Sequence, residues 1–341
     1  MPIINDSAIL KSRDGFVRPS DLVGSEVELL VVSNFGNERY EKFRVEETVS
    51  SYARIRFSHG AILDLGYDTV MVGTVDTGYE GCKPKNTADV VADIQRKFKY
   101  QTYYPSDFFT LGQKEQLIDL SEFTDRKSGT FNLAQPDVYK FLGWAARTGR
   151  VVNDLFLVTC STDQTDNYKD LLESGLPLVL EKVSPSRVTT RYYFKINWFI
   201  DVVRGLGCCT NDLFIADDLS FNCTDEMATS FREGFIGCRH LRPHMKYNEN
   251  AIRYDCLFSE DRVSDLLFLL HRAGKSTILV NDTKGYRISE QLPKWSHYVQ
   301  YVTHYDVPTR MYRIVPVGES IKSVLWISEV LFKSNDKKGE H

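Results

Sequence analysis

One segment of the chain alternates cationic and apolar residues at the spacing of a β-strand. Between positions 187 and 195, one side of an extended strand would carry Arg187, Thr189, Arg191, Tyr193 and Lys195, and the other Val188, Thr190, Tyr192 and Phe194. Cationic side chains above a core-facing apolar surface suit contact with phosphate groups. A solvated edge strand with no binding role is the alternative interpretation of this pattern.

A second cationic group lies further along the chain. No acidic residue occurs from Gly234 through Asn248, and the basic residues in and just after this window are Arg239, His240, Arg242, His244, Lys246 and Arg253. A divalent metal needs hard anionic oxygens, so this neighbourhood repels a metal and attracts phosphates. Contacts of that kind give salt-dependent affinity and carry no sequence choice.

A third group interleaves cations with aromatic rings. Arg96, Lys97 and Lys99 alternate with Phe98 and with tyrosines at positions 100, 103 and 104. Proteins that bind single strands use this combination, because bases stack on the rings while cations follow the backbone. The alternative is a helix end followed by a core-packing strand. The predicted partner is nucleic acid, and because of this segment RNA is expected as a ligand as well as DNA.

Other chemistry is not indicated. The seven cysteines are an odd number without a CxxC pair, which predicts reduced thiols, no zinc site and a cytoplasmic location. The only Gly-x-Gly, at Gly205, lacks a preceding strand and a third glycine, so no nucleotide cofactor is expected. A formal charge of -4 restricts nucleic-acid contact to a local basic face. No stretch has the roughly 20 apolar residues of a membrane span.

The pattern of elements predicts an α+β fold in two modules. Residues 1–88 read as short β-branched strands separated by turns, and an amphipathic helix is expected from Thr87 to Lys97. From 135 to 282 the order helix, hairpin, helix occurs twice, which predicts a pseudo-two-fold αββαββα duplication. The expected organisation is an N-terminal β part (1–88), a connector (89–134), the duplicated domain (135–282), a C-terminal β part (283–332) and a flexible tail (333–341).

This layout resembles an intein, in which a Hint fold formed by both chain ends is interrupted by a LAGLIDADG homing endonuclease. Residues 141–149 and 232–240 are similar to the paired motif helices of the nuclease. Residues 7–24, 57–68 and 311–317 are similar to Hint strands. The resemblance implies a saddle of hairpins whose concave face lies along the duplex.

The residues that perform the family's chemistry are replaced. The position before the closing residue of each motif, where the family has a metal-binding acid, holds Thr148 in the first segment, which closes with Gly149, and Arg239 in the second, which closes with His240. The splicing nucleophile position falls on Pro2, and the Thr and His positions of the Hint motif fall on Leu65 and Asp68. No His-Asn pair closes the chain.

The sequence therefore predicts a non-enzymatic nucleic-acid-binding protein without metal or cofactor, and the resemblance implies a viral or mobile-element setting. Two alternatives stay open. One is a site-specific endonuclease with rearranged ligands, for which Asp154 and Glu233 are the nearest acids. The other is a structural or protein-interaction module, which the negative overall charge favours.

Overall fold

The computed structural model divides the chain into two compact units. Unit 1 comprises residues 1–108 and 293–341, and unit 2 comprises residues 109–292. The structure describes residues 1–32, 38–57, 62–75, 83–95, 100–103, 117–119, 130–210, 215–216, 219–220, 223–238, 242–243, 252–253, 264–273, 276–282, 285–291, 296–318, 324–327 and 330–333. Helices and antiparallel strands are present in both units, which confirms the α+β class.

Unit 1 is built on one antiparallel sheet whose strands come from both ends of the chain. Among the described residues its order is β1-β6-β5-β20-β9-β7-β22-β21-β4-β2-β3, with β8 paired to β7. The elements are β1 (Ile3–Ile4), β2 (Leu10–Ser12), β3 (Gly15–Val17), η1 (Pro19–Leu22), β4 (Glu26–Val32), β5 (Glu38–Phe57), β6 (Ile62–Gly66), β7 (Val70–Val75), β8 (Lys83–Asn86), α1 (Thr87–Gln95), β9 (Tyr100–Tyr103), β20 (Ser296–Pro316), β21 (Val324–Ile327) and β22 (Val330–Lys333).

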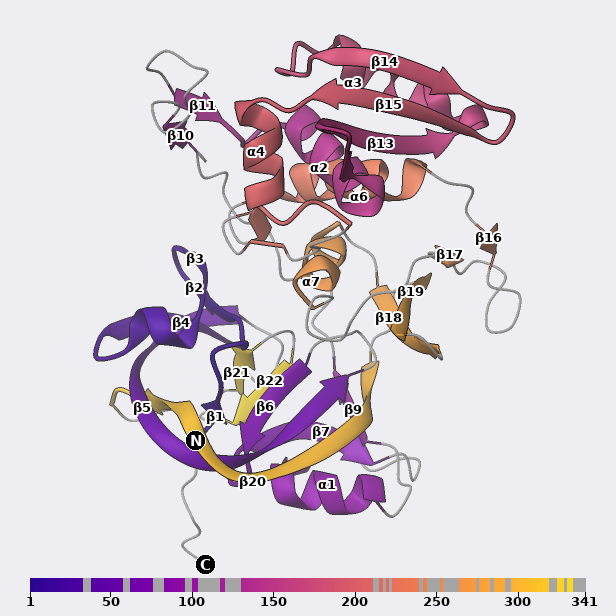
Figure 1. The fold of residues 1–341 in the computed structure, drawn as a ribbon. Helices are drawn as coiled ribbons and strands as arrows, with labels where there is room; N and C mark the ends of the chain where they lie inside the picture. The colour runs from indigo at the N-terminus through magenta and orange to yellow at the C-terminus, as the bar shows by residue number, and fades with distance from the viewer. Residues whose placement is uncertain are drawn as a thin grey trace, which may run out of the picture. The chain divides into compact units, whose positions relative to one another are not determined.

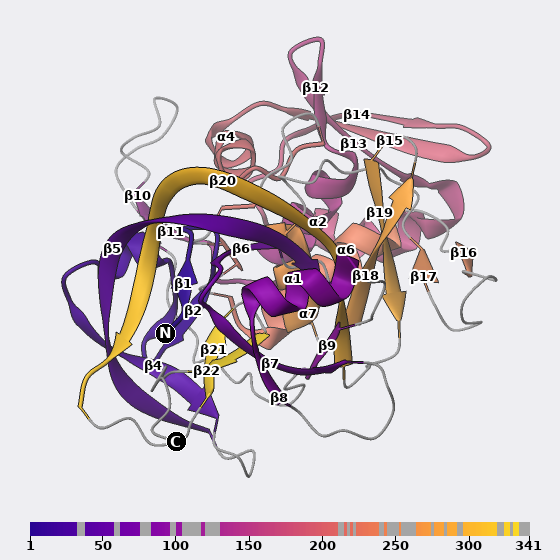
Figure 2. The ribbon, with the colours of Figure 1, turned by 90° about the horizontal axis from the view of Figure 1, so that it is seen from below.

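The two long strands β5 and β20 form a curved ribbon that organises unit 1 (Figures 1 and 2). Alternate β5 residues, including Phe43, Val45, Ala53 and Ile55, are fully buried, as period-2 patterning requires. Bulges interrupt the ribbon next to Val299 and between Tyr305 and Thr309, and extra residues of this kind bend a strand. The core of this unit therefore lies inside the curve, where α1 contributes Val90 and Val91.

Unit 2 contains two four-stranded antiparallel sheets and the helices that pack on them. The first sheet has the order β12-β13-β15-β14, and the second has the order β16-β17-β19-β18. The elements are β10 (Leu117–Asp119), β11 (Thr130–Asn132), α2 (Pro136–Thr148), β12 (Arg150–Val152), β13 (Leu155–Ser161), η3 (Thr162–Tyr168), α3 (Lys169–Glu173), β14 (Leu180–Pro185), β15 (Thr189–Lys195), α4 (Trp198–Gly205), α6 (Asp225–Gly237), β16 (Arg242–Pro243), β17 (Ile252–Arg253), α7 (Ser264–Arg272), β18 (Ser276–Asp282) and β19 (Gly285–Gln291).

The unit boundaries differ from the expected ones at both ends of unit 2. Unit 1 extends to Phe108 because β9 pairs with β20 and β7, so part of the expected connector belongs to the large sheet. Unit 2 extends to Leu292 because β19 pairs with β18 and β17. Within the described residues, no helix is long and apolar enough to cross a membrane.

Helices α2 and α6 touch through a reciprocal pair of glycines. A Cβ atom on Gly143 would overlap the carbonyl oxygen of Phe231 and lie 2.9 Å from the backbone nitrogen of Phe235. A Cβ atom on Gly234 would likewise overlap the carbonyl oxygen of Lys140 and lie 3.1 Å from the backbone nitrogen of Trp144. Each glycine therefore meets the residue three before and the residue one after its counterpart, which is the signature of a local two-fold relation.

This reciprocity defines which positions of the two helices are equivalent. Gly143 corresponds to Gly234, so Thr148 corresponds to Arg239, the same alignment that the two motif segments gave. The aromatic core surrounds the contact on the α2 side. The Trp144 ring stacks on Tyr168 with centroids 4.0 Å apart, and Phe141 packs edge-on against Phe194.

We expect Gly143→Ala to destabilise the protein by more than about 3 kcal/mol, because the new methyl group must push two helix backbones apart. Gly205→Ala is the matched control, since Gly205 is also helical and nothing lies within 4 Å of an added Cβ atom. There the loss of backbone freedom in the unfolded chain predicts a small stabilisation, below about 1 kcal/mol. Urea unfolding of both variants measures the difference, and equal stabilities would contradict the close helix contact.

Candidate nucleic-acid interface

The predicted alternation is present in β15, with a different starting point. Thr190, Tyr192 and Phe194 are buried against the helices, while Arg191 and Lys195 are exposed on the opposite face. Val188, expected on the core side, is 73% exposed.

The reason is a hairpin turn at the start of β15. The Ser186 backbone N–H donates to the Thr189 carbonyl oxygen at 3.0 Å, and the Thr189 backbone N–H donates to the Ser186 hydroxyl oxygen at 3.0 Å. The strand therefore begins at Thr189. Arg187 and Val188 lie at the exposed tip of the hairpin, outside the strand face on which the sequence placed Arg187.

Strand register adds two cations that the sequence did not single out. Arg150 of β12 is opposite Leu157 of β13, Leu157 is opposite Tyr193 of β15, and Tyr193 is opposite Lys182 of β14. Directly paired residues project from the same face of a sheet. One cross-strand row therefore runs Arg150, Leu157, Tyr193, Lys182 on the face turned away from α2 and α6, which we call the open face (Figures 1 and 2). Leu157, in the middle of this row, is 2% exposed.

A tight turn fixes that register. Asn153 and Asp154 join β12 to β13 with φ angles of 49° and 59°, the left-handed values of a type I′ hairpin turn. The turn closes the Val152–Leu155 pair and so places Arg150 opposite Leu157. Asp154, the acid that follows Thr148 most closely in the sequence, is the second residue of this turn and is exposed.

The next row carries hydroxyl groups around a single cation. Arg191 is opposite Thr159 of β13 and Ser184 of β14, and Thr189 lies two residues before it on the same face. In the four strands of this sheet Glu181 is the single acidic residue, against Arg150, Lys182, Arg191 and Lys195. The face is consequently positive, although the whole chain is not.

Two of these cations are already engaged. The Lys195 ammonium lies 2.6 Å from the Glu181 carboxylate, and both side chains are substantially exposed, so this pair adds little stability. The Lys182 ammonium lies 5.8 Å from the centroid of the Tyr193 ring, within the range of a cation–π contact.

The remaining predicted residues divide into two groups. Arg242 and Arg253 are directly paired in the β16–β17 ladder, so the second sheet also brings two predicted cations to one register position. Outside the described residues lie Arg239, His240, His244, Lys246, Arg96, Lys97 and Lys99. The second and third cationic groups therefore stay predictions.

Thr148, where the resemblance to the motif helices led us to expect a position for an acid, has a structural role. Its hydroxyl donates to the Trp144 carbonyl oxygen and accepts from the Thr159 backbone N–H, both at 3.1 Å. The Trp144 indole N–H donates to the Thr159 carbonyl oxygen at 2.9 Å. Since β12 pairs with β13 only as far as Leu157, these α2 side chains bind the strand backbone that β12 leaves unpaired. The described residues contain no group of three or more His, Cys, Asp or Glu residues able to hold a metal ion.

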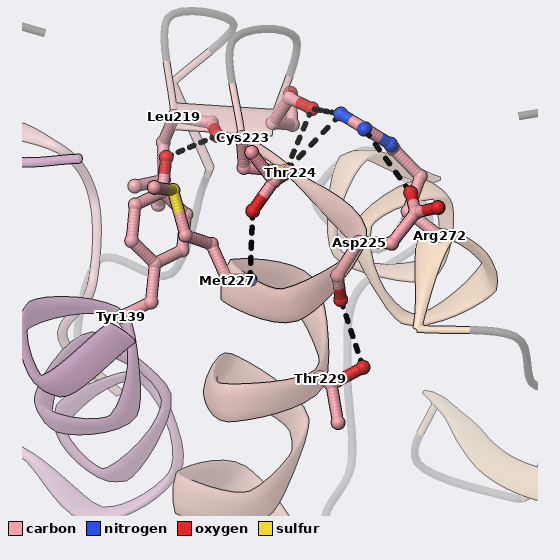
Figure 3. A network of polar contacts seen from close by, with 9 residues as sticks. Tyr139, Leu219, Cys223, Thr224, Asp225, Met227, Thr229 and Arg272 are labelled. Atoms are coloured by element: carbon pink, nitrogen blue, oxygen red, sulfur yellow. Dashed lines mark hydrogen bonds and ion pairs between the residues drawn. The ribbon is translucent and has the colours of Figure 1, made fainter. Parts of the chain in front are cut away.

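The start of α6 is held by a separate polar network (Figure 3). The Thr224 hydroxyl caps the helix by accepting from the Met227 backbone N–H at 3.2 Å. Arg272 of α7, whose side chain is 1% exposed, donates to the Ser220 carbonyl oxygen and the Cys223 sulfur and lies 3.4 Å from Asp225. Burial raises the pKa of the Cys223 thiol to about 11, so Arg272 faces a neutral thiol and a half-exposed carboxylate.

The three residues at the expected splicing positions, Pro2, Leu65 and Asp68, lie in or beside the large sheet of unit 1. The Pro2 carbonyl oxygen accepts from the Ile314 backbone N–H at 3.0 Å, Leu65 is fully buried and Asp68 is exposed. Thr69, which no motif in the sequence singled out, is a buried polar residue beside the N-terminal strand. Its buried hydroxyl accepts from the Ile3 backbone N–H at 2.9 Å and donates to the Ile3 carbonyl oxygen at 3.1 Å.

We expect Thr148→Val, which keeps the shape and removes the hydroxyl, to cost about 1–3 kcal/mol by leaving the Thr159 N–H without its acceptor. The Thr159 amide should also exchange its proton faster than in the wild type. Thr229→Val is the matched control, because within the described part of the chain the exposed Thr229 hydroxyl bonds only to the Asp225 carbonyl oxygen of its own helix. Urea unfolding and amide exchange test this, and wild-type protection of Thr159 in Thr148→Val would contradict the role.

Comparisons with known proteins do not place this site in a family. No model of a known protein family matches the chain. No curated protein matches it significantly in sequence. The site is therefore defined by the register of its strands and by the contact of α2 with α6.

Proposed function

We propose that this protein is a non-catalytic nucleic-acid-binding protein, and that the open face of the β12-β13-β15-β14 sheet is its binding surface. The observation that carries the proposal is the set of four cations on one sheet face with a single acid among them. The phosphates of a nucleic acid of any sequence can neutralise these cations, because the backbone charge is uniform along the strand.

The same face favours a duplex over a single strand. Sequence-tolerant binding of single strands depends on aromatic rings that accept stacked bases. Tyr193 is the aromatic residue on the open face of these four strands, and Lys182 already approaches its ring. Exposed hydroxyl and cationic groups are left for the ligand, and these suit the phosphates of duplex DNA or RNA.

We propose further that unit 2 is a LAGLIDADG-like domain inserted into a Hint-like unit 1. Three observations support this: unit 1 is assembled from both ends of the chain, α2 and α6 meet through equivalent glycines, and each of these helices is followed by antiparallel strands. The support is geometrical, and the chemistry is proposed to be lost. Thr148 bonds to the backbone of β13 where the family's nuclease would use an acid.

A reducing compartment suits this protein. The five described cysteines, Cys160, Cys208, Cys209, Cys223 and Cys238, are free and buried. Burial raises the pKa of Cys160 to about 11, so this thiol stays protonated near neutral pH and is a poor nucleophile. We place the binding activity in a cytoplasm, that of the host if the protein is viral.

The proposal predicts a salt-dependent affinity that depends on Arg150 and Lys182. Arg150→Ala and Lys182→Ala should each weaken binding to any duplex and lower the slope of log affinity against log salt by about 1. Lys169→Ala is the matched control, because exposed Lys169 begins α3, which packs with α2 on the core side of the sheet. Fluorescence anisotropy with labelled duplex DNA, duplex RNA and single strands, in Mg²⁺ and across a salt series, measures this.

Each result has a distinct meaning. Intact probe bound with a slope that falls in both variants supports the proposal. Cleaved probe would instead revive the endonuclease alternative. Absence of binding to all probes at low salt would leave the protein-interaction alternative.

A further inference from the structure

Strand β14 forms an edge of the first sheet, and among the described residues no strand pairs with its outer side (Figure 1). An edge of this kind presents free N–H and C=O groups that can pair with another chain. Apolar side chains are also exposed along it, with Leu180 44% and Val183 43% exposed. Residues 179–188, which include β14 and the turn after it, hold four of the nine exposed large hydrophobic residues of the described chain. Such a concentration indicates an interaction site.

A β-bulge determines which side of the sheet each residue of β14 faces. Leu180 and Val183 face the helices, because their partners on β15 are buried residues of that strand. Lys182 belongs to the row on the open face. The register shift between Leu180 and Lys182 inserts Glu181 as an extra residue, and its carboxylate lies 2.6 Å from the ammonium group of Lys195 on the open face. Two successive charged residues therefore share one side of the strand.

The segment 180–183 consequently has the same pattern in both directions. Its sides are helix, open, open, helix, and its residues are apolar, charged, charged, apolar. A two-fold axis normal to the sheet keeps each side chain on its own side. An axis between Glu181 and Lys182 places each of them opposite the other residue of a second copy, and places Leu180 opposite Val183. Without the bulge, this register would bring together residues from opposite sides of the sheet.

We propose that two copies of this chain pair through β14, so that the first sheet continues antiparallel from one copy into the other. Charge complementarity selects a second copy as the occupant, because Glu181 of each copy meets Lys182 of the other and the pair occurs twice by symmetry. Leu180 and Val183 leave water together on the helix side. The inference rests on the edge strand alone and does not depend on the proposed function.

The dimer is expected to be weak. Strand β14 is six residues long, and interfaces well below the standard size are typical of transient complexes. We therefore expect a dissociation constant in the micromolar range. In the dimer the Glu181 carboxylate would lie between Lys195 of its own chain and Lys182 of the second copy.

Sedimentation velocity of the full chain, without nucleic acid and over a micromolar concentration series, tests the proposal. The wild type should pass from monomer to dimer as the concentration rises and should form no larger species, because a two-fold contact closes on itself. Amide hydrogen exchange at the two ends of the series locates the contact. The amides of β14 should exchange more slowly in the dimer.

Charge variants test the register. Lys182→Glu and Glu181→Lys each place like charges opposite one another twice, so each should weaken the dimer at least about 10-fold. An equimolar mixture of these two variants restores both pairs of opposite charges and should form a mixed dimer. The double variant that exchanges the two charges should also dimerise. Lys169→Glu is the matched control, because it makes the same charge change at an exposed position at the start of α3.

The results separate this register from other contacts. A wild type that stays monomeric throughout the series would overturn the proposal, and so would a Lys182→Glu dimer of wild-type affinity. Single variants that lose the dimer and form none when mixed would overturn the two-fold register. Urea unfolding of each variant at the lowest concentration confirms that these exposed substitutions leave the fold in place. Since no nucleic acid is present, none of these results bears on the proposed function.

Discussion

The close approach of α2 and α6 is the constraint on which unit 2 depends. Two backbones meet where Gly143 and Gly234 lack side chains, and any other residue at either position would place an atom inside a carbonyl oxygen of the opposite helix. Close packing of this kind transmits strain, because there is no void to absorb a displaced group. The position of one helix therefore fixes the position of the other, and of the strand that each one holds.

The first sheet takes its position from this contact through α2. Trp144 and Thr148 near the end of α2 bind both backbone groups of Thr159, and the Ser161 N–H donates to the Cys238 carbonyl oxygen at the end of α6 at 2.8 Å. Strand β13 is thus tied to both helix ends. Since β13 is paired on one side to β12 and on the other to β15, its register aligns the cations of the open face. The basic surface is a consequence of helix packing beneath it.

The sequence contained the local part of this arrangement. The alternation in β15 could be predicted, because apolar residues that become buried, such as Tyr192 and Phe194, recur with a period of two. The alignment of the two motif segments also made Gly143 equivalent to Gly234. The sequence did not predict that Arg150 and Lys182 share this face, because their positions on it depend on pairing between strands about 30 residues apart. The exposed hairpin tip at Val188 was missed for a related reason: period alone does not show where a strand begins.

Thr148 joins the end of α2 to the first sheet without a charged side chain. The residue is 6% exposed and is the last residue of α2, where unpaired carbonyl groups create a partial negative charge. A carboxylate there would be opposed both by that charge and by burial, and a bound cation would be needed to offset the cost. A threonine hydroxyl accepts one hydrogen bond and donates another, so it satisfies the Thr159 N–H and the Trp144 carbonyl at once and carries no charge. A threonine at this position therefore joins the helix to the sheet that it supports without any charge to offset.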